Sequence, residues 1–366
     1  MYKTIFVHLH NDFSGSPVVL LSVIKAFEMR LEGSIGLYIG SNGRGVLDGT
    51  SISKTHYGYR LYKNKFLRLC CYLLSQIFLL YKLARDPKIN QNTTIYVNTV
   101  LPVGAMFYGW LTNKKVICHV HELPFASSKI YKLLFKLTFY FANKIVVVST
   151  YQRDQLAHYG KTMIIIPNCL ADTQPKPAPV KKRNTQEKMN ILFVGSLKKY
   201  KGIDQFVSLA NEFCDDERFE FRMVLNGEKC EIENYIASHL KLENLSIQGP
   251  SFEMKSNYIW SDLVVNFSLP GQWVETFGLT LLEGMQFGRP VIAPLTGGHT
   301  DFVKDGINGF LIDASDIQGL KKALNNLQLN NKLYFSLAKE AKKTAALFEF
   351  DQFCIKIHHL YREFEI

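Results

Sequence analysis

The chain has 366 residues, 47% of them apolar, and a formal net charge of +11. This length exceeds what one hydrophobic core usually serves, so two domains are expected, and the apolar share excludes a chain that is disordered throughout. The charge is uneven, because residues 1–180 contain 21 Lys and Arg against 8 Asp and Glu, whereas the remainder contains 22 against 24. The basic half predicts an anionic partner. No nucleic-acid-binding module is recognisable, so we expect a membrane surface and not a nucleic acid.

The cysteines and the N-terminus indicate the compartment. Seven cysteines lack the paired spacing of a metal site, and several lie in apolar runs, as is typical of reduced thiols in a cytoplasmic protein. The first residues, MYKTIFVHLH, begin directly with a strand pattern and have no signal-peptide features. We therefore expect a cytoplasmic protein without a bound metal or cofactor.

Apolar runs of strand length alternate with longer helical patterns in the first half of the chain. This alternation predicts an α/β domain, a parallel sheet with helices on both faces. The expected strands are Thr4–Leu9, Ile35–Ile39, Thr94–Val97, Val116–Val120, Ile145–Val148 and Met163–Ile166, and the clearest helices are Val18–Met29 and Lys129–Ala142.

A second alternation follows a segment rich in proline and charge. Residues 173–188 are predicted to be a linker, which separates a first domain (1–172) from a second domain (189–349). Strands of the second domain are expected at Ile191–Val194, Phe219–Leu225, Leu263–Phe267 and Val291–Ala293, and a final helix at Phe350–Glu365. Ligands of such sheets bind beyond the carboxyl ends of the strands, so the site is expected between the two domains.

Two motifs of the first domain follow expected strands. Gly15 and Ser16 open a helix directly after the first strand, where backbone N–H groups favour a phosphate, although a simple strand-to-helix turn fits equally well. His119 and His121 lie on the same side of a strand end, and Glu122 follows them. A buried, hydrogen-bonded histidine is the stronger interpretation than a metal ligand, because no further ligands are evident.

In the second domain, Gly195 and Ser196 end the first strand, and Lys201-Gly202 follows in the turn to a helix. From the residues alone, an exposed turn lysine is an available interpretation of Lys201. Gly249 and Pro250 form a later turn.

Glu275 and Glu283 give the strongest signal. Glu275 is expected on a loop and Glu283 on a helix, with Phe277, Gly278 and Leu279 at the helix start. Carboxylates accept hydrogen bonds from sugar or ribose hydroxyls, and the helix start favours an anion. The pattern therefore fits a phosphorylated, polyhydroxylated ligand. The spacing alone would more often mark a solvated helix face.

In its context this spacing resembles the retaining, nucleotide-sugar-dependent glycosyltransferases known as glycosyl transferases group 1, or glycosyltransferase family four. The resemblance covers most of the chain but is specific mainly from Gly195 to Gly309. It implies the GT-B fold of two facing Rossmann-like domains, with the terminal helix (350–366) packed on the first domain.

The resemblance also implies site roles. Glu283 would bind the ribose, Glu275 the donor sugar, Lys201 the diphosphate, and the backbone at Phe277–Leu279 the sugar. The first-domain loop at Gly15 and Ser16 would face the diphosphate, and His121 would lie near the donor sugar. Gly249 would lie near the base, with UDP or GDP favoured.

Ser196 departs from the family pattern, because many relatives have a second cation there; Lys198 or Lys199 would be needed in its place. Members of this family work without a divalent metal, in keeping with the lack of an Asp-x-Asp element.

Two segments of the first domain bear on the acceptor. Residues 60–85 and 129–144 are apolar, aromatic and edged with Lys and Arg, without an uninterrupted apolar run of about 20 residues. They are interpreted as interfacial helices at the inner face of the cytoplasmic membrane, with basic-faced core helices as the alternative. The acceptor is then a glycan or a lipid-linked unit, as in bacterial surface polysaccharide or lipopolysaccharide synthesis. Competing hypotheses are a silent sugar- or nucleotide-binding subunit and a GT-B epimerase or phosphorylase.

Overall fold

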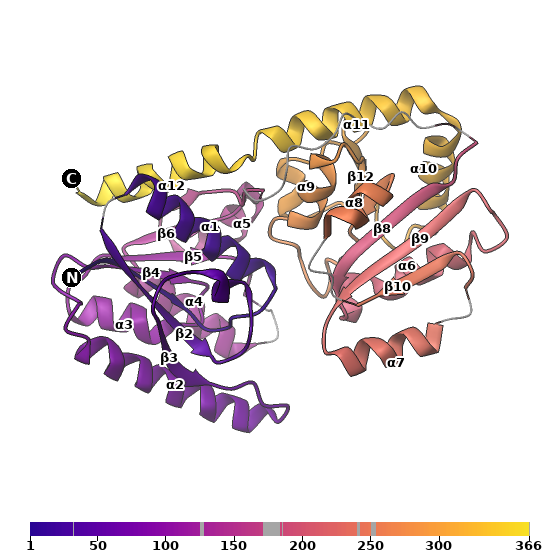
Figure 1. Cartoon of the computed structure of the whole chain (residues 1–366). Helices are drawn as coiled ribbons and strands as arrows, with labels where there is room; N and C mark the ends of the chain where they lie inside the picture. Colours follow the sequence, from indigo (N-terminus) through magenta and orange to yellow (C-terminus); the bar gives the residue numbers. More distant parts are fainter. Residues whose placement is uncertain are drawn as a thin grey trace. The chain divides into compact units, whose positions relative to one another are not determined.

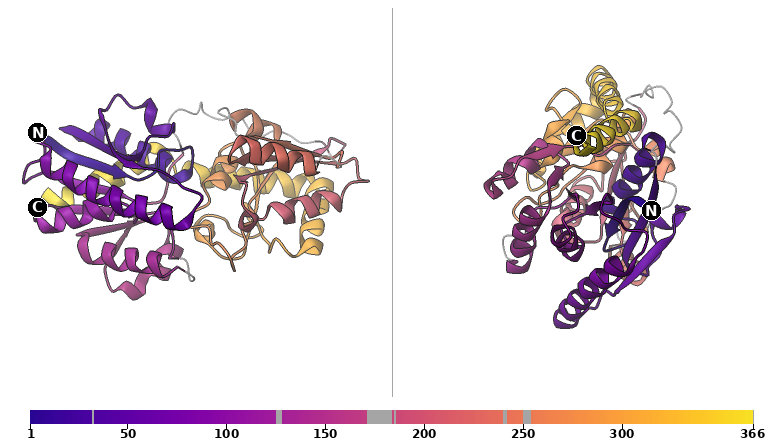
Figure 2. Two further views of the ribbon diagram at one scale, coloured as in Figure 1. Left: turned by 90° about the horizontal axis from the view of Figure 1, so that it is seen from below. Right: turned by 90° about the vertical axis from the view of Figure 1, so that its left-hand side faces the viewer.

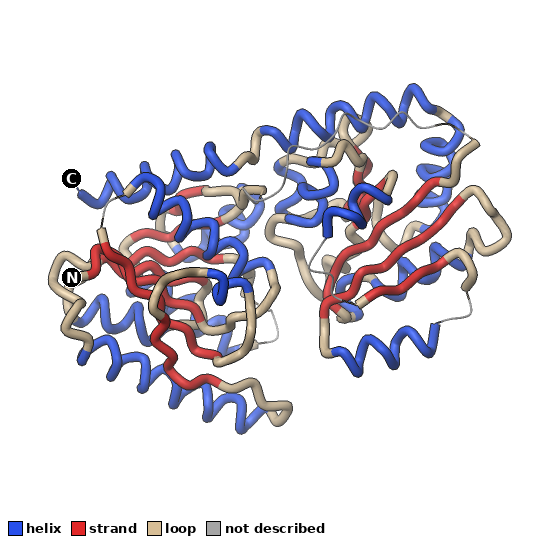
Figure 3. The backbone as a smooth tube through the Cα atoms, viewed as in Figure 1, coloured by secondary structure: helices blue, strands red, loops and turns tan. Residues whose placement is uncertain are grey.

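The computed structural model describes residues 1–31, 33–124, 128–170, 184, 186–239, 242–249 and 254–365. The chain divides into two compact units, Met1–Cys169 with Phe350–Ile366 and Leu170–Glu349. Each unit is built on its own parallel sheet (Figure 3). Of the predicted linker at 173–188 the structure describes residues 184 and 186–188, and Pro250 lies outside the described residues.

The sheet of the first unit has seven parallel strands in the order β3-β2-β1-β4-β5-β6-β7. Five of the six predicted strands differ from the observed bounds by one to three residues and Val116–Val120 agrees, whereas β3 was not predicted. The strands are β1 (Tyr2–His8), β2 (Ser34–Ser41), β3 (Lys54–Tyr59), β4 (Thr94–Asn98), β5 (Val116–Val120), β6 (Lys144–Val147) and β7 (Met163–Ile165). The strand order reverses between β1 and β4, which places a topological switch point there.

Helices cover both faces of this sheet. On one face α1 (Gly15–Arg30) packs against the terminal helix α12 (Phe350–Glu365), and the two lie side by side in Figure 1. On the other face α2 (Lys65–Arg85), α3 (Val103–Leu111) and α4 (Lys129–Phe141) form a layer, and the right-hand view of Figure 2 shows the sheet between this layer and α12. The short helix α5 (Thr150–Leu156) completes the unit with two 3-10 turns, Val46–Gly49 and Ala157–Tyr159.

The second unit has six parallel strands in the order β10-β9-β8-β11-β12-β13. The strands are β8 (Met189–Ser196), β9 (Phe219–Asn226), β10 (Leu245–Gln248), β11 (Leu263–Val265), β12 (Val291–Ala293) and β13 (Gly309–Leu311). The edge strands β10 and β13 were not predicted. The helices are α6 (Ile203–Asn211), α7 (Lys229–His239), α8 (Met254–Trp260), α9 (Leu279–Gln286), α10 (Ile317–Leu329) and α11 (Asn331–Ala346), with 3-10 turns at Lys199–Lys201 and Gly298–Asp301.

The second sheet also carries helices on two faces. Ile203 and Phe206 of α6 and Leu320 and Leu324 of α10 share one apolar core with strand residues such as Phe193. The opposite face takes α9, because Gly284 lies against the Val264 side chain, where a Cβ would come within 2.6 Å of Cγ2. The strand order reverses between β8 and β11, so a second switch point lies beside α9.

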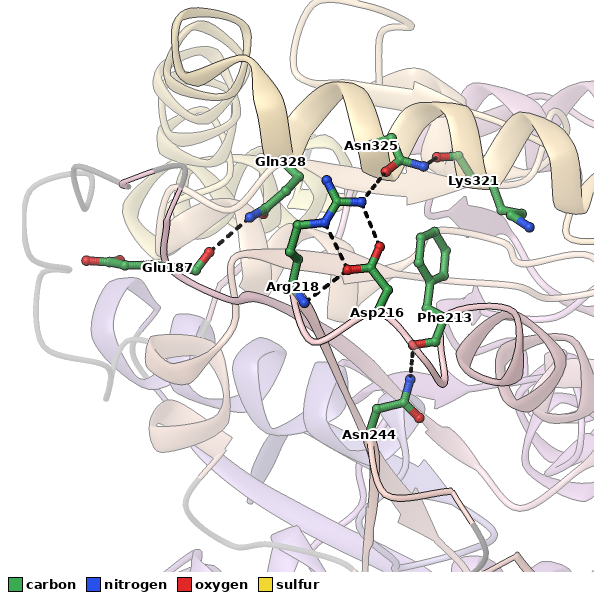
Figure 4. A network of polar contacts seen from close by, with 8 residues as sticks. All are labelled: Glu187, Phe213, Asp216, Arg218, Asn244, Lys321, Asn325 and Gln328. Atoms are coloured by element: carbon green, nitrogen blue, oxygen red, sulfur yellow. Dashed lines mark hydrogen bonds and ion pairs between the residues drawn. The ribbon is translucent and has the colours of Figure 1, made fainter.

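Polar contacts fix the end of this sheet that lies away from the switch point (Figure 4). The Arg218 guanidinium donates to both carboxylate oxygens of Asp216, at 2.9 and 2.7 Å, and to Asn325 of α10 at 3.3 Å. Gln328 of α10 donates to the Glu187 carbonyl oxygen at 3.0 Å. These bonds hold α10 against the start of β8 and β9, a structural role.

Candidate functional site

The second-unit site forms around the start of α9, next to the switch point. Glu275 lies on the loop between β11 and α9, and Glu283 lies within α9, as the sequence predicted. Phe277 and Gly278 precede α9, and Leu279 is its first residue, with Gly278 as N-cap in the left-handed region. The first amide groups of α9 lack partners within the helix, so this start can accept an anion.

Lys201 and Glu275 form an ion pair. Lys201 Nζ donates to Glu275 Oε2 at 2.7 Å, and the two side chains are 18% and 21% exposed. The ammonium also lies 5.3 Å from the ring centroid of Trp273. Burial raises the pKa of Glu275, but the Lys201 ammonium, with His299 and a hydrogen bond from Asn266, holds it below its usual value. Glu275 is therefore a carboxylate at neutral pH.

Two glycines permit the close approach of the loops that carry this pair. Gly202, directly after Lys201, has φ +81°, and a Cβ there would lie 2.0 Å from the Phe267 carbonyl oxygen. Gly297 has φ +141°, and a Cβ there would lie 2.9 Å from the Glu275 carbonyl oxygen. The next residue, Gly298, donates its N–H to that same oxygen at 2.7 Å. The double glycine of the sequence therefore anchors the Glu275 loop.

Glu283 is half-buried and has a buried partner. Its Oε2 accepts a hydrogen bond from the Tyr258 hydroxyl at 2.5 Å. Burial raises the pKa of Glu283 to about 7, although the Tyr258 hydrogen bond acts in the opposite direction. Near neutral pH, Glu283 is therefore present both as the carboxylate and as the carboxylic acid.

The remaining predicted residues of this unit lie at strand ends. Gly195 and Ser196 end β8, and a Cβ at Gly195 would lie 4.0 Å from Cβ of Lys201. Lys198 and Lys199 are both exposed, and Lys199 Nζ lies 3.9 Å from Asp204 Oδ2. Gly249 follows β10, at the edge of the sheet and two strands from β8.

In the first unit, Gly15 is the first residue of α1 and Ser16 the second, directly after the switch point. The buried Asn98 side chain donates to the Ser16 carbonyl oxygen at 3.0 Å. Its amide oxygen lies 2.8 Å from His121 Nε2. The Asn98 NH2 group donates to the Ser16 carbonyl, so the Asn98 side-chain oxygen is the atom that faces the imidazole. Because this oxygen can only accept, His121 Nε2 carries the proton.

His119 and His121 are neutral, because burial lowers the pKa of each. His119 is fully buried beside His121, with ring centroids 4.2 Å apart, and burial lowers the pKa of His119 to about 3 and that of His121 well below its usual value. Tyr96 OH lies 2.7 Å from His119 Nδ1. Glu122 accepts backbone N–H bonds from Val100 and His121, and burial raises its pKa to about 7. Its recorded bonds thus go to the backbone, not to an imidazole.

The predicted residues therefore form one group around Lys201, Glu275 and α9 in the second unit and another at Gly15, Ser16 and His121 in the first. Sequence reasoning missed the residues that support them, namely Asn98, Tyr258, Asn266 and His299. Asn98 and Asn266 stand at or just after strands beside the switch points, so polar residues at strand ends were an available signal. Within the described parts of the chain, no three or more His, Cys, Asp or Glu residues lie close enough to hold a metal.

Comparison with known proteins identifies the class. Residues 176–344 match the family described as Glycosyl transferases group 1, and seven-plus-six parallel strands are the GT-B fold. The match to this glycosyl transferase family therefore lies in the second unit of the chain.

Individual relatives and structures agree with this class. An uncharacterized glycosyltransferase of Methanocaldococcus jannaschii is 27% identical over 269 residues, 71% of this chain and 72% of that protein. O-antigen chain mannosyltransferase C of Escherichia coli is 32% identical over 146 residues, 38% of this chain and 37% of that protein. The crystal structure of Anabaena HepE in complex with UDP-glucose has a TM-score of 0.79 at 16% identity and covers 99% of this chain and 100% of that one.

Proposed function

We propose that this chain transfers a sugar from a nucleotide-diphosphate sugar to a hydroxyl of a glycan or lipid-linked acceptor, with retention of anomeric configuration. The observation that carries the proposal is the Lys201–Glu275 pair at 2.7 Å beside the start of α9, with Glu283 on the same helix. Together they offer a cation, a carboxylate and a helix start to one ligand. That set matches a diphosphate, a sugar and a ribose.

Each residue has a role in this reaction. The Lys201 ammonium has three N–H donors. It can therefore keep its hydrogen bond to Glu275 and also donate to the diphosphate as negative charge develops there. Glu275 accepts hydrogen bonds from donor-sugar hydroxyls, and Glu283 from ribose hydroxyls. The neutral His121 donates a hydrogen bond instead of acting as a base, because its pKa lies well below the usual value.

In the transfer step, the bond from the anomeric carbon to the diphosphate oxygen breaks, and the acceptor oxygen forms its bond on the same face of the sugar. The leaving nucleoside diphosphate takes the acceptor proton. Lys201 and the amide groups at α9 stabilise the leaving group, so the proposal requires no divalent metal. UDP is the first nucleotide to test, because HepE is crystallised with UDP-glucose.

Thermal-shift titration with UDP, GDP and ADP tests the donor site. One nucleotide should raise the unfolding temperature, because a ligand at 100 times its Kd stabilises the folded state by about 2.7 kcal/mol. Glu283→Ala should abolish that rise. Turnover of the matching nucleotide sugar should then be lost in Glu275→Gln. The proposal is contradicted if none of the three nucleotides has an effect at millimolar concentration.

A silent sugar- or nucleotide-binding subunit is the second candidate, and Ser196 is the observation that favours it, because the family's second cation is missing there. Such a subunit would bind a nucleotide but give no turnover of any nucleotide sugar, with or without acceptor. An epimerase would convert the donor without an acceptor, and a phosphorylase would require inorganic phosphate, so the same assays separate all of these.

We further propose that the first unit binds the inner face of the cytoplasmic membrane through the α2–α3–α4 layer. Helix α2 carries an exposed apolar stripe at helical spacing: Phe66, Leu73, Leu74, Ile77, Phe78 and Tyr81, between 53% and 71% exposed. Exposed Trp110 and Leu111 of α3 and Ile130, Leu133 and Tyr140 of α4 extend the apolar area. The three helices contain no Asp or Glu but seven Lys and Arg: Lys65, Arg68, Lys82, Arg85, Lys129, Lys132 and Lys136.

By length and composition α2 is also a candidate to cross a membrane, although the sequence lacks an uninterrupted apolar run of about 20 residues and favoured an interfacial helix. Its contacts favour a position on the surface. Leu79 and Leu83 are fully buried in the core of the unit, and the Tyr72 hydroxyl donates to the Leu101 carbonyl oxygen at 2.7 Å. Insertion across a bilayer would break these contacts, whereas lying in the interface keeps them.

Vesicle co-sedimentation tests this surface. The protein should bind vesicles containing phosphatidylglycerol, release them at high salt, and bind neutral vesicles weakly. A Leu74→Glu, Ile77→Glu variant should lose binding, whereas Leu329→Glu in the second unit, 65% exposed, is the matched control. Equal binding by the double variant would contradict the membrane proposal. If the wild-type protein forms a dimer without lipid and the double variant is a monomer, the surface is instead an interface between two copies of the chain.

A further inference from the structure

Tyr258 is a buried neighbour of the candidate ribose carboxylate. It lies on α8, has no exposed surface, and its hydroxyl donates to Glu283 Oε2 at 2.5 Å. Its ring stacks on Phe287, with centroids 5.7 Å apart and planes at 14°. Burial raises the pKa of Tyr258 well above its usual value, so the hydroxyl keeps its proton and can only donate to a carboxylate.

The backbone of Tyr258 is held as firmly as its side chain. Arg289, in the turn after α9, donates from Nε to the Tyr258 carbonyl oxygen at 3.0 Å and from one terminal nitrogen to the Ile259 carbonyl oxygen at 2.9 Å. Arg289 itself is only 5% exposed. Hydrogen bonds from the turn after α9 thus hold the backbone of α8, and the Tyr258 hydroxyl of α8 donates to Glu283 within α9. The orientation of the carboxylate is therefore set by two separate attachments.

Among the residues that the structure describes, few ionisable groups face the Tyr258–Glu283 pair. From α8 the titratable group facing Glu283 is Tyr258, and from the turn after α9 it is the Arg289 guanidinium, which is directed to backbone carbonyls. Strands β11 and β12, which pack against α9, consist of Leu, Val, Ile and Ala. The buried face of α11, which also packs on α9, comprises Tyr334, Leu337, Ala338, Ala341 and Ala345, and the Tyr334 hydroxyl donates to the Asp262 carbonyl oxygen.

We propose that Tyr258 is a positioning residue for ribose recognition: its hydroxyl occupies Oε2 of Glu283 and directs Oε1 to a ribose hydroxyl. This inference rests on the proposed function. One hydrogen bond from a fixed donor defines the plane of the carboxylate and leaves its second oxygen as an acceptor. The same bond opposes the effect of burial, which favours the protonated acid. Without it, Glu283 would hold a proton at neutral pH and could not accept from both ribose hydroxyls.

The variant Tyr258→Phe keeps the stack on Phe287 and removes only the hydroxyl. Calorimetric titration of the full chain should use whichever of UDP, GDP and ADP stabilises it, together with the 2′,3′-dideoxy form of that nucleotide, from pH 6 to pH 9. At pH 7 the variant should bind the nucleotide about 10- to 100-fold more weakly, the range for a hydrogen bond to a charged group. The loss should shrink toward pH 9, where Glu283 ionises without help. Binding of the dideoxy nucleotide should not change.

Tyr334→Phe is the matched control, because it removes the hydroxyl of another buried tyrosine in the same unit. It should leave the ratio of ribose to dideoxy affinities unchanged. In a Glu283→Gln background, Tyr258→Phe should have no further effect on that ratio.

A loss in Tyr258→Phe that is equal for both nucleotides, or that does not vary with pH, would overturn the inference and assign Tyr258 to packing alone. A wild-type chain that binds none of the nucleotides would overturn the proposed function, and this inference with it. The two failures are therefore distinguishable by the wild-type titration.

Discussion

Substitution of Lys201 tests how much the Lys201–Glu275 pair contributes to the free energy of unfolding, separately from its contribution to transfer activity. Lys201→Met keeps an unbranched apolar side chain one atom shorter than lysine but leaves the Glu275 carboxylate without its 2.7 Å partner. A partner lost from a buried ion pair costs about 3–5 kcal/mol, because an unpaired charge stays in a poorly solvated site. Since the two side chains are 18% and 21% exposed, the lower end of that range, roughly 3 kcal/mol, is expected.

The stability difference between the wild type and Lys201→Met should depend on pH through the ionisation of Glu275. In the wild type the pKa of Glu275 lies below its usual 4.5, so the carboxylate contributes stability above pH 4.5 that is lost as the pH falls through the folded-state pKa. In Lys201→Met, burial dominates and raises the pKa of Glu275 above 4.5. Its ionisation then opposes folding as the pH rises. The difference in stability between the two proteins should therefore be largest near pH 7 and smallest below pH 4.5.

Urea unfolding of both proteins at several pH values measures this difference. The double variant Lys201→Met, Glu275→Gln, which removes both charges, should regain about 2 kcal/mol of the loss, because no buried charge is left unpaired. Its transfer activity should nevertheless remain absent. A stability difference that does not change with pH, or a double variant no more stable than Lys201→Met, would refute the assignment of the loss to an unpaired carboxylate.

Three further outcomes are expected. Gly202→Ala should lower the free energy of unfolding by roughly 3 kcal/mol in urea titration, because its φ of +81° and the 2.0 Å approach to the Phe267 carbonyl both oppose a Cβ. The stability of Glu122→Gln relative to the wild type should rise by roughly 2 kcal/mol between pH 5 and pH 8, because a carboxyl whose folded pKa is raised from 4.5 to about 7 loses stability as the pH rises through that interval. Asn98→Ala should lower kcat about tenfold in a donor-saturated transfer assay, since it removes the acceptor at His121 Nε2.

The interior of each unit was largely predictable from the sequence, and its edges were not. Interior strands such as Leu263–Val265 and Val291–Ala293 are continuous apolar runs, which buried parallel strands require. The edge strands β3 (KTHYGY) and β10 (LSIQ) carry polar residues and only half-bury several positions, so no apolar run marks them. They form because neighbouring strands offer backbone hydrogen bonds, a tertiary effect that local patterns do not encode.

The candidate site shows the same division. Glu275, Glu283 and Gly278 were recognisable because carboxylates and a glycine stand close together in the sequence. The partners of these residues come from distant positions: Tyr258 lies 25 residues before Glu283, and Lys201 lies 74 residues before Glu275. Pairing at such separations depends on strand order, since β8 and β11 become neighbours only when the sheet assembles.

We expect Lys198, and not Lys199, to supply the cation that many relatives carry at the position of Ser196. Lys199 Nζ lies 3.9 Å from Asp204 Oδ2, so part of its charge is already neutralised within the same turn. The backbone of Lys198 is bonded to both Ser196 and Lys201, because its N–H donates to the Ser196 carbonyl oxygen at 2.7 Å and its carbonyl oxygen accepts from the Lys201 N–H at 2.9 Å. Lys198 thus has its place fixed relative to Lys201.

We therefore expect Lys198→Ala to weaken binding of the nucleoside diphosphate about tenfold, as for one charge-assisted contact to phosphate, and Lys199→Ala to change it less than twofold. Both side chains are exposed, so neither variant should alter the free energy of unfolding by more than about 0.5 kcal/mol. Titration of the diphosphate and of the free nucleoside separates phosphate binding from base binding. If the two variants weaken diphosphate binding equally, the turn acts through its summed charge and not through a positioned lysine.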